Sequence, residues 1–442
     1  MRSLLGAEYD AFLSAFDVPA EKAFHVNLAR IGKERMASWL RAEGFDAVPL
    51  FNDSAWRFAD SEENAIGHKS FHHAGAVYSQ DPAAMLVLSG VELSPELRIL
   101  DLCAAPGGKT SQLAMAVDGG SGYVFANEPN PSRNRILVSN IERMGYRNVI
   151  VTCLSPEELA TLYPGHFDLV LVDAPCSGEG MFRKYPESVS EWSEDAVLRC
   201  ALRQRDILNS AAVCLRPGGR LIYSTCTWAV EEDEAQLDYL TSQLHFTPLS
   251  LPAPVAAMAY PTAPGAARCY PHRYAGEGQF MAYLQKEGEH SLTSRPSAFC
   301  EGLRDLTEKE HNELRDCLGD EAGRFWFYSY RDRVILFPGN IPRLPARNVS
   351  CVGVTVAEKD PAKKRLVPHH QFFSAYGAEL LHRIDCEPGD PRIAQYLSGM
   401  ELPAEGSDRH LASFLCCGVP IGGLRAAGGR CKNLYPKGLR ER

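Results

Sequence analysis

The chain has 442 residues, of which 45% are hydrophobic and 23% charged, and its formal net charge is −9 at pH 7. This composition is typical of globular proteins, and the length predicts several domains, each with its own core. Apolar stretches such as 83–91 are far shorter than the ~20 residues of a bilayer span, so we expect a cytoplasmic protein without a membrane anchor. The negative total charge does not by itself suggest a nucleic-acid partner.

Fourteen cysteines are scattered along the chain. No two of them are spaced as C-x-x-C, and H-E-x-x-H is absent from the sequence. A chain of this length needs no disulfides for stability. We therefore expect reduced thiols and no bound metal.

The chain begins with residues 1–72, which lack glycine turns between strands and predict a small separate module. A short apolar run at 98–103 then ends at Pro106-Gly-Gly108, and residues 110–117 have helical character. The alternation continues with further expected strands at 123–126, 148–152, 167–172 and 220–224, and a helix at 132–144. This order predicts a parallel sheet that binds its ligand at the carboxyl ends of the strands. We expect this α/β domain to cover residues 73–288.

Two more regions follow a polar stretch at 286–290. Residues 325–330 and 333–337 predict strands joined by a tight turn, in a small α+β subdomain over 289–361. The glycine-punctuated stretch 411–439 predicts short strands in a C-terminal domain over 362–442. Within the α/β domain, the proline- and alanine-rich residues 251–267 are interpreted as a loop.

The first glycine turn has the character of a cofactor loop. Residues 101–109 read Asp-Leu-Cys-Ala-Ala-Pro-Gly-Gly-Lys, and their glycines allow close backbone approach to a ligand. Glu128, at the end of the next strand, is placed to accept hydrogen bonds from ribose hydroxyls. A P-loop would need glycine where Cys103 stands, and G-x-G-x-x-G is missing. S-adenosyl-L-methionine (SAM), which has no phosphates, fits this loop better.

Two cysteines follow neighbouring predicted strands. Asp173 and Cys176 come after the fourth strand, and Cys226 comes after the fifth. Adjacent strands lie ~4.8 Å apart, so both thiols can face one base. Cytosine C5 is a poor nucleophile, and its methylation requires a thiolate to add at C6. DNA cytosine methyltransferases take this thiolate from the fourth-strand loop alone, so the additional Cys226 indicates RNA.

Five motifs resemble those of the RNA (cytosine-C5)-methyltransferases of the Nol1/Nop2/Sun family, most closely its bacterial RsmF-type 16S rRNA members. They are Gln80-Asp81-Pro82, the loop Cys103 to Lys109, Asp173 to Gly180, Ser224-Thr-Cys-Thr227 and Arg268 to Phe280. The resemblance implies a Rossmann-like SAM methyltransferase sheet with an antiparallel last strand.

It also implies roles for individual residues. Cys226 would attack C6, Cys176 would assist product release, and Asp173 would line the base pocket. The residues expected to bind SAM are Cys103, Ala104, Ala105, Pro106, Gly107, Gly108, Lys109, Glu128 and Asp173. The family often has an acid that contacts the adenine near position 155, so Ser155 or backbone groups would replace it here. In the N-terminal RNA-contacting module, His25 of His25-Val-Asn-Leu28 stands where the family has arginine.

The C-terminal residues are similar to the PUA-like RNA-binding domain of the RsmF-type enzymes. Gly418 to Gly423 and Lys432 to Arg440 carry this similarity, and residues 425–442 hold six basic residues against one acid. We expect Lys432, Lys437 and Arg440 to contact phosphates and Tyr435 to stack on a base.

The expected function is methyl transfer from SAM to cytosine C5 in rRNA. The expected partner is 16S rRNA or the small ribosomal subunit, and the expected oligomeric state is a monomer. The alternative is a non-catalytic rRNA-binding assembly factor on a methyltransferase fold.

Overall fold

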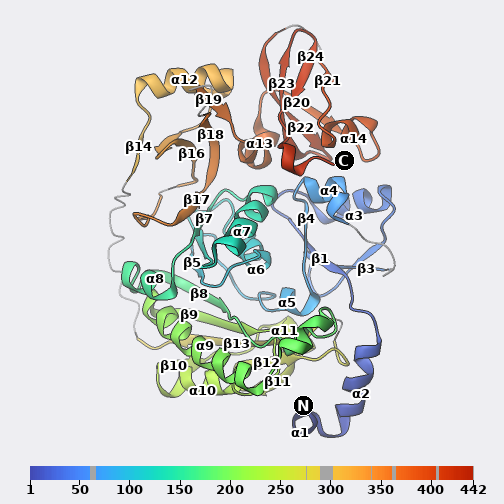
Figure 1. Ribbon diagram of the computed structural model, residues 1–442, viewed down its shortest axis with the longest axis vertical. Helices are drawn as coiled ribbons and strands as arrows, with labels where there is room; N and C mark the ends of the chain where they lie inside the picture. Colours follow the sequence, from blue (N-terminus) through green and yellow to red (C-terminus); the bar gives the residue numbers. More distant parts are fainter. Residues whose placement is uncertain are drawn as a thin grey trace.

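The computed structural model describes residues 1–59, 66–274, 276–288, 302–339, 341–360, 365–404 and 408–441. These residues form four β-sheets, and the largest lies in the middle of the chain (Figure 1). Within the described part of the chain, no helix combines the length and the apolar character needed to cross a membrane.

The central sheet has ten strands, and its core is parallel, as the alternation predicted. Strands β9, β8, β5, β6 and β7 run parallel, and β13 lies antiparallel to β9. The antiparallel last strand that the family resemblance implied is therefore confirmed. It is β13, which begins within the last catalytic motif, Arg268 to Phe280. In spatial order the strands are β11 (Tyr260–Ala263), β12 (Ala266–Cys269), β13 (Gln279–Lys286), β9 (Leu215–Thr225), β8 (Phe167–Asp173), β5 (Arg98–Asp101), β6 (Tyr123–Asn127), β7 (Val149–Thr152) and β17 (Val349–Val352), and β10 (Phe246–Pro248) pairs with β13.

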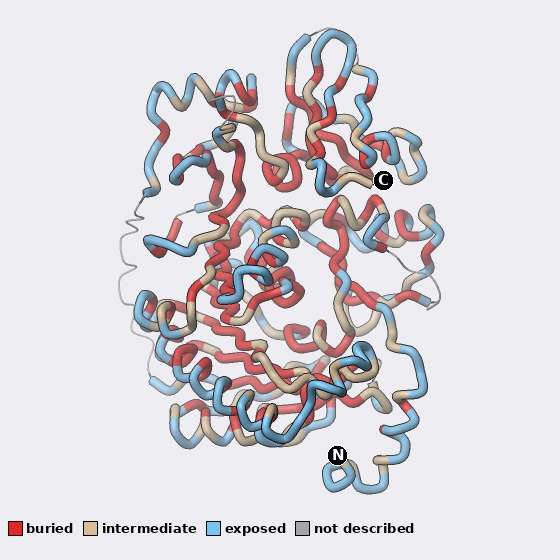
Figure 2. Tube along the Cα trace, viewed as in Figure 1, coloured by how far each residue is buried: buried red, intermediate tan, exposed pale blue. Residues whose placement is uncertain are grey.

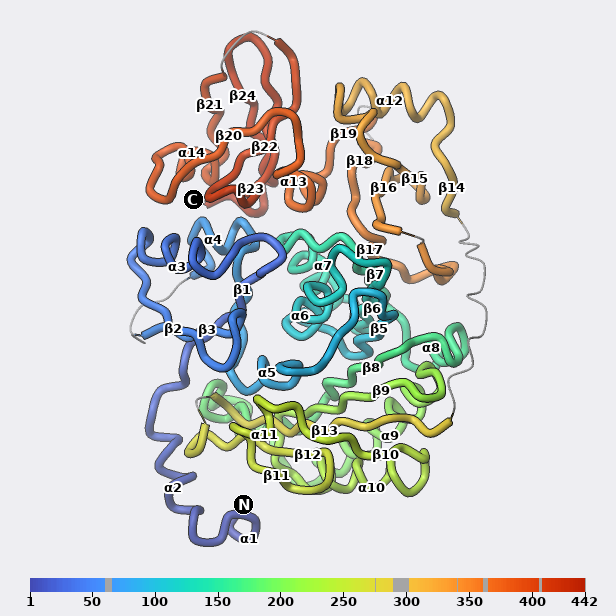
Figure 3. Tube along the Cα trace, turned by 180° about the vertical axis from the view of Figure 1, so that it is seen from behind, coloured from blue at the N-terminus to red at the C-terminus, as the bar shows by residue number. Residues whose placement is uncertain are grey.

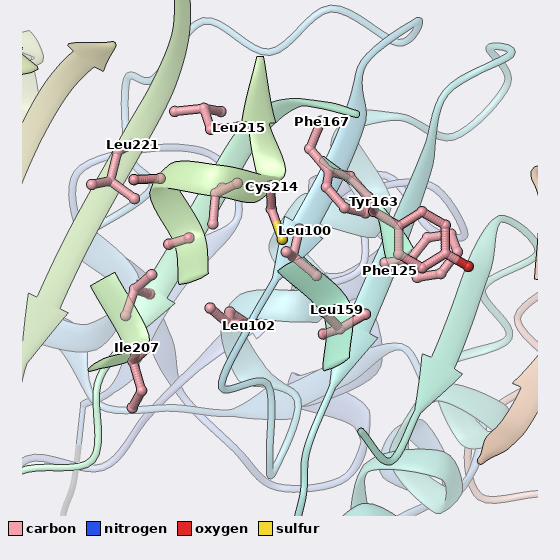
Figure 4. Packing of buried hydrophobic residues seen from close by; sticks show 14 of the residues in the cluster. Leu100, Leu102, Phe125, Leu159, Tyr163, Phe167, Ile207, Cys214, Leu215 and Leu221 are labelled. Atoms are coloured by element: carbon pink, nitrogen blue, oxygen red, sulfur yellow. The ribbon is translucent and has the colours of Figure 1, made fainter. Parts of the chain in front are cut away.

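Helices cover both faces of this sheet because side chains alternate along each strand. Leu100 and Phe125 point to a core packed by helices α8 (Pro156–Leu162), α9 (Glu194–Cys214) and α10 (Glu234–Ser242) (Figure 4). Ile99 and Val124 point to the other core, under α5 (Pro82–Leu86), α6 (Gly108–Ala116), α7 (Pro131–Met144) and α11 (Ala253–Met258). Figure 2 shows the resulting buried layer through the middle of the molecule.

Two strand assignments differ from expectation. Residues 251–267 are not a loop, since they contain α11, β11 and the start of β12. Strand β17 comes from beyond the predicted end of the domain and pairs antiparallel with β7 at the sheet edge. Neither feature has a local periodicity that marks it.

The N-terminal sheet has the order β2 (Ala47–Pro49), β3 (Ala55–Phe58), β1 (Ala23–Val26) and β4 (Val77–Ser79). Helices α3 (Lys33–Ala42) and α4 (Ser70–His73) belong to the same region. Because β4 pairs with β1, this sheet continues past the predicted boundary at residue 72.

A third sheet follows the α/β domain, with the order β14 (Leu303–Asp305), β15 (Tyr328–Tyr330), β16 (Arg333–Leu336), β18 (Val354–Asp360) and β19 (Arg365–Pro368). The predicted tight turn between β15 and β16 is confirmed. The predicted boundary at 288 adjoins residues 289–301, which lie outside the described residues, as does the boundary at 361. The strands on either side of 361, β18 and β19, pair with each other, so that boundary would divide a hairpin.

The C-terminal sheet has the order β20 (Arg383–Cys386), β22 (His410–Cys416), β23 (Val419–Ala427), β24 (Arg430–Asn433) and β21 (Leu402–Pro403). Its helix α14 (Pro391–Leu397) and the preceding α13 (His370–Tyr376) flank it (Figure 1). Helix α12 (Glu308–Leu318) packs on β19 of the third sheet.

The two ends of the chain share one hydrophobic core. Trp39 and Phe71 of the N-terminal region belong to the same buried cluster as Tyr396 and Phe414 of the C-terminal domain. Such a core couples the stability of the two regions, because separating them exposes apolar surface to water. The N-terminal and C-terminal regions are therefore one packing unit, although 300 residues separate them in the sequence.

Arg30 joins this unit to the catalytic sheet. Its guanidinium donates to the carbonyl of Ala74 at 2.7 Å, to those of Arg143 and Met144 at 3.3 and 3.2 Å, and to that of Ser374. These carbonyls end α4 and α7 and lie in the last turn of α13. The last carbonyls of a helix lack intrahelical donors and carry partial negative charge, so one cation satisfies three helix ends.

We predict that Arg30→Met lowers the thermal unfolding midpoint by several degrees. The substitution removes a donor from partly buried carbonyls, at a cost of about 1–3 kcal/mol, although the Met144 carbonyl still accepts from Asn27 at 3.1 Å. Scanning calorimetry measures the shift. Arg35→Met is the matched control, since Arg35 is 52% exposed and 3.8 Å from Glu387. Equal midpoints for the two variants would contradict the role of Arg30.

Candidate active site

The loop between β5 and α6 is built to bring backbone close to a ligand. Gly107 has φ 114°, in the left-handed region, and stands at the start of α6. A side chain at Gly107 would meet Leu137, and one at Gly108 would meet Gln80 and Tyr78. Asp101 is buried, which raises its pKa to about 7 although Thr110 donates to it at 2.6 Å. The loop therefore has no room for larger residues.

Glu128 lies at the carboxyl end of β6 and is 3% exposed. Its Oε1 accepts a hydrogen bond from the Asn130 amide at 2.9 Å, and its Oε2 lies 3.4 Å from Arg133. Arg133 also donates to the carbonyl of Ala105 in the glycine loop at 2.8 Å. A buried acid beside a glycine loop suits an adenosine ribose, so these residues fit SAM.

An ion pair connects the glycine loop to the catalytic strands. The Lys109 Nζ lies 2.8 Å from Oδ2 of Asp173, at the end of β8. Ser224 of β9 donates to the other Asp173 oxygen at 2.7 Å. Asp173 is therefore held between the expected cofactor loop and the two cysteines.

The two predicted thiols meet. The Sγ atoms of Cys176 and Cys226 are 3.3 Å apart, because β8 and β9 are adjacent and parallel with Asp173 beside Ser224. The neighbouring sulfur and burial raise the pKa of Cys176 well above its ordinary value. Cys103 lies apart in the glycine loop, where burial raises its pKa as well. Every cysteine in the described residues is a free thiol.

Short contacts join the loop that carries Cys176 to the loop that carries Cys226. The Gly180 amide donates to the carbonyl of Cys226 at 2.9 Å, and the hydroxyls of Ser177 and Thr227 are 2.9 Å apart. A side chain at Gly180 would lie 2.7 Å from that Cys226 carbonyl, so only glycine fits. The positions of the thiols are therefore set by backbone contacts as well as by the strands.

Sequence reasoning missed the acids that support these loops. Buried Glu232 accepts from the Ser177 amide at 3.1 Å and from Gln204 of α9 at 2.7 Å. Next to it, buried Asp233 pairs with buried Arg268 at 2.8 Å. The one available signal was the acidic run 231–234, which five residues separate from the end of β9, a place where solvent-facing acids are equally common.

Two motif residues have structural partners. Buried His25 is hydrogen-bonded to Gln80 at 2.9 Å, and burial lowers its pKa to about 4. A neutral, buried histidine does not offer RNA the cation that the family's arginine would. Ser155 caps α8 by accepting from the Glu158 amide at 3.3 Å, so its contact with adenine stays a prediction.

The C-terminal candidates divide into exposed and buried residues. Lys432 and Lys437 are exposed. The expectation that Tyr435 stacks on a base is wrong, because Tyr435 is 3% exposed and its hydroxyl is bonded to His73 at 2.8 Å. Arg440 donates to the Tyr435 carbonyl at 3.0 Å, which leaves it partly engaged. The two lysines are the better candidates for phosphate contacts.

Three family models match successive parts of the chain. The N-terminal domain of 16S rRNA methyltransferase RsmF matches residues 1–82, 16S rRNA methyltransferase RsmB/F matches 89–285, and the methyltransferase RsmF PUA domain matches 383–441. The chain is 31% identical to ribosomal RNA small subunit methyltransferase F of Citrobacter koseri, covering 98% of this chain and 92% of that protein. It is 30% identical to the protein of that name from Salmonella typhi, with the same coverage.

Two solved structures are similar in fold to about two thirds of this chain. A methyltransferase homolog protein from Pyrococcus horikoshii is 26% identical, with a TM-score of 0.56 over 64% of this chain and 91% of that chain. NSun6 from Pyrococcus horikoshii, solved with SFG, is 20% identical, with a TM-score of 0.58 over 65% of this chain and 97% of that chain. At this identity the NSun6 likeness shows the fold alone.

We predict that Glu128→Ala raises the dissociation constant for SAM about tenfold or more. Loss of a charge-assisted hydrogen bond to the ribose costs about 1.5–3 kcal/mol. Titration calorimetry measures the constant directly. Glu157→Ala, which removes an exposed acid from α8, is the control and should change it less than twofold. A Glu128 variant that matches this control would show that Glu128 does not bind the cofactor.

Proposed function

This chain belongs to the family of ribosomal RNA small subunit methyltransferases F, and we propose that it methylates cytosine C5 in 16S rRNA through a covalent bond to Cys226. It is a SAM-dependent rRNA methyltransferase with a Rossmann-like catalytic domain and a C-terminal PUA domain. The observation that carries the covalent proposal is the 3.3 Å separation of the Cys176 and Cys226 sulfurs at the ends of adjacent strands.

Cys226 provides the nucleophile. Its thiolate forms a bond to C6 of cytosine, and the electron pair of the C5–C6 double bond moves onto C5. When SAM is bound, its sulfonium supplies the methyl group to C5. The C5 proton then passes to a water molecule. Its electron pair restores the double bond as the bond from C6 to Cys226 Sγ breaks, and the electron pair of that bond leaves on the sulfur.

Cys176 serves the second half of this sequence. The neighbouring Cys226 sulfur and burial raise the pKa of Cys176, so Cys176 enters the reaction as a protonated thiol. Cys176 can then donate its proton to the Cys226 sulfur, 3.3 Å away, as the bond from C6 to that sulfur breaks and the product is released. Asp173, paired to Lys109 and Ser224, separates the cofactor loop from the thiols and lines the base pocket.

The cofactor residues proposed here are the loop Cys103 to Lys109, Glu128, Ser155 and Asp173. The left-handed Gly107 and the buried Glu128 support this assignment. The non-catalytic assembly factor is not favoured, because such a protein has no need of two paired thiols beside this loop.

The remaining proposals concern partner and place. We assign RNA contact to the exposed Lys432 and Lys437 of the PUA domain, where lysines can bind phosphates. The cytoplasm is the proposed location, since the curated relatives are named for ribosomal RNA. The monomeric state stays a prediction.

We predict opposite kinetic effects of the two thiols. Cys226→Ala should abolish methyl transfer and any covalent adduct, because C5 never becomes nucleophilic. Cys176→Ala should instead accumulate enzyme joined to RNA, seen as a slow band on a denaturing gel. Fluorine at C5 cannot leave as a proton does, so RNA with 5-fluorocytosine should trap the wild-type enzyme in the same way.

The matched control is Cys200→Ala, which removes a half-buried thiol from α9 and leaves both the thiol pair and the glycine loop intact. It should form the trapped adduct, and peptide mapping of that adduct should identify Cys226. Methyl transfer by Cys226→Ala, or an adduct on Cys176, would show that the nucleophile is assigned to the wrong strand.

We predict that Lys432→Glu combined with Lys437→Glu weakens binding to a 16S rRNA fragment and makes it less salt-dependent. Each lost phosphate contact should reduce the salt slope by about one, while SAM affinity is unchanged. Filter binding at several salt concentrations measures both quantities. Deleting the whole domain is a poorer test, since it would expose the core shared with the N-terminal region.

Lys309→Glu combined with Lys359→Glu is the charge-matched control, because Lys309 is 85% exposed on α12 and Lys359 is exposed on β18, both away from the PUA domain. An equal loss of RNA affinity in this control would mean that total charge, not the PUA surface, accounts for the effect.

A further inference from the structure

The first seventeen residues form an arm that leaves the N-terminal sheet. It contains helices α1 (Arg2–Leu5) and α2 (Tyr9–Ser14) with short 3-10 turns after each. The arm lies beside the part of the catalytic domain that holds α11, β11 and β12, in both the front and the back view (Figures 1 and 3). Figure 2 colours most of the arm as exposed, yet Phe12 is 3% exposed.

Phe12 inserts among aromatic rings of the catalytic domain. Its ring centroid is 5.0 Å from that of Trp228, 6.3 Å from Tyr270 and 5.8 Å from His272, in edge-to-face orientation. Phe16 adds a second contact to Trp228 at 6.3 Å. Edge-to-face packing of this kind fixes ring position as well as burying area.

Trp228 is two residues from Cys226, so a shift of Trp228 would also move the backbone that carries the thiol. Its backbone amide donates to Glu179 of the Cys176 loop at 3.3 Å, and its indole donates to the Cys269 carbonyl at 3.2 Å. Gly278 touches the indole closely enough that a side chain there would lie 2.5 Å from the ring. Trp228 is thus confined between the arm and the glycine contacts behind it.

Two polar attachments bring the arm to the other segments of the thiol site. Arg183, seven residues after Cys176, donates to the Ala15 carbonyl at 3.2 Å and pairs with buried Glu277 at 2.9 Å. Glu8 accepts from His272 at 3.0 Å and is bonded to Arg273. The arm therefore contacts the segments that follow Cys176 and Cys226 in the chain, and it also contacts residues 270–273.

We propose that the N-terminal arm is a positioning element for Cys226, acting through Phe12 and Trp228. The proposal rests on the proposed covalent function. The arm touches neither the glycine loop nor Glu128 in any contact of the described residues, so it should govern the attack on the base without governing SAM affinity. Substitution of Phe12 should then slow adduct formation at saturating RNA and SAM.

The test compares Phe12→Ala with Phe12→Leu and with Leu13→Ala. Leu13 is the next residue of α2 and is 46% exposed, so its variant removes a similar apolar group outside the contact. The rate of adduct formation on 5-fluorocytosine RNA, the single-turnover rate of methyl transfer and the SAM dissociation constant are measured for each. We expect Phe12→Ala to lower both rates tenfold or more with SAM affinity within twofold, Phe12→Leu to recover part of the loss, and Leu13→Ala to match the wild type.

Phe12→Ala rates within twofold of the wild type would overturn the proposal, and so would a parallel loss of SAM affinity, which indicates general damage. If Phe12→Ala does not fold, Phe16→Ala applies the same criteria to the second ring on Trp228. Failure of the covalent function is distinguishable, because the wild-type enzyme would then methylate rRNA without forming an adduct on Cys226.

Discussion

The parallel pairing of β8 with β9 is the constraint on which the active site depends. This pairing places Asp173 beside Ser224, and the chain beyond each residue then brings a cysteine to the same edge of the sheet. A hairpin connection would have sent the two carboxyl ends to opposite edges, so helix α9 between the strands is as necessary as the strands themselves. The ion pair from Lys109 to Asp173 connects this edge to the glycine loop.

Around this edge the enzyme is held together by contacts between distant parts of the chain. The N-terminal and C-terminal regions share a core, and Arg30 connects that core to the end of α7. These contacts hold the C-terminal domain against the N-terminal region, and they hold that region against the catalytic domain. Tyr435 is buried inside this shared core, so it supports the junction between the two regions.

Much of the catalytic domain was predictable because its signals are local. Strands at 98–101, 123–127, 149–152 and 167–173 coincide with short apolar runs of the sequence. The predictions failed where the pattern is not local. Strand β17 pairs with β7 although it begins 197 residues after β7 ends. Residues 251–267 form a helix and strands that their proline- and alanine-rich composition did not predict. Glu232 is buried against Gln204, and Arg268 is buried against Asp233. Each pair joins separate segments of the chain, so neither burial can be predicted from one segment alone.

The amino-acid sequence by itself determined the α/β order, the glycine loop and the placement of Cys176 and Cys226 after successive strands. These follow from side-chain period and turn residues, which act over a few neighbouring positions. Only the tertiary structure decided that the sulfurs lie 3.3 Å apart, that Tyr435 is buried and that Phe12 packs on Trp228. Those outcomes depend on which apolar surfaces, far apart in the sequence, are buried against each other. The packing of the whole molecule decides this, because it removes such surfaces from water together.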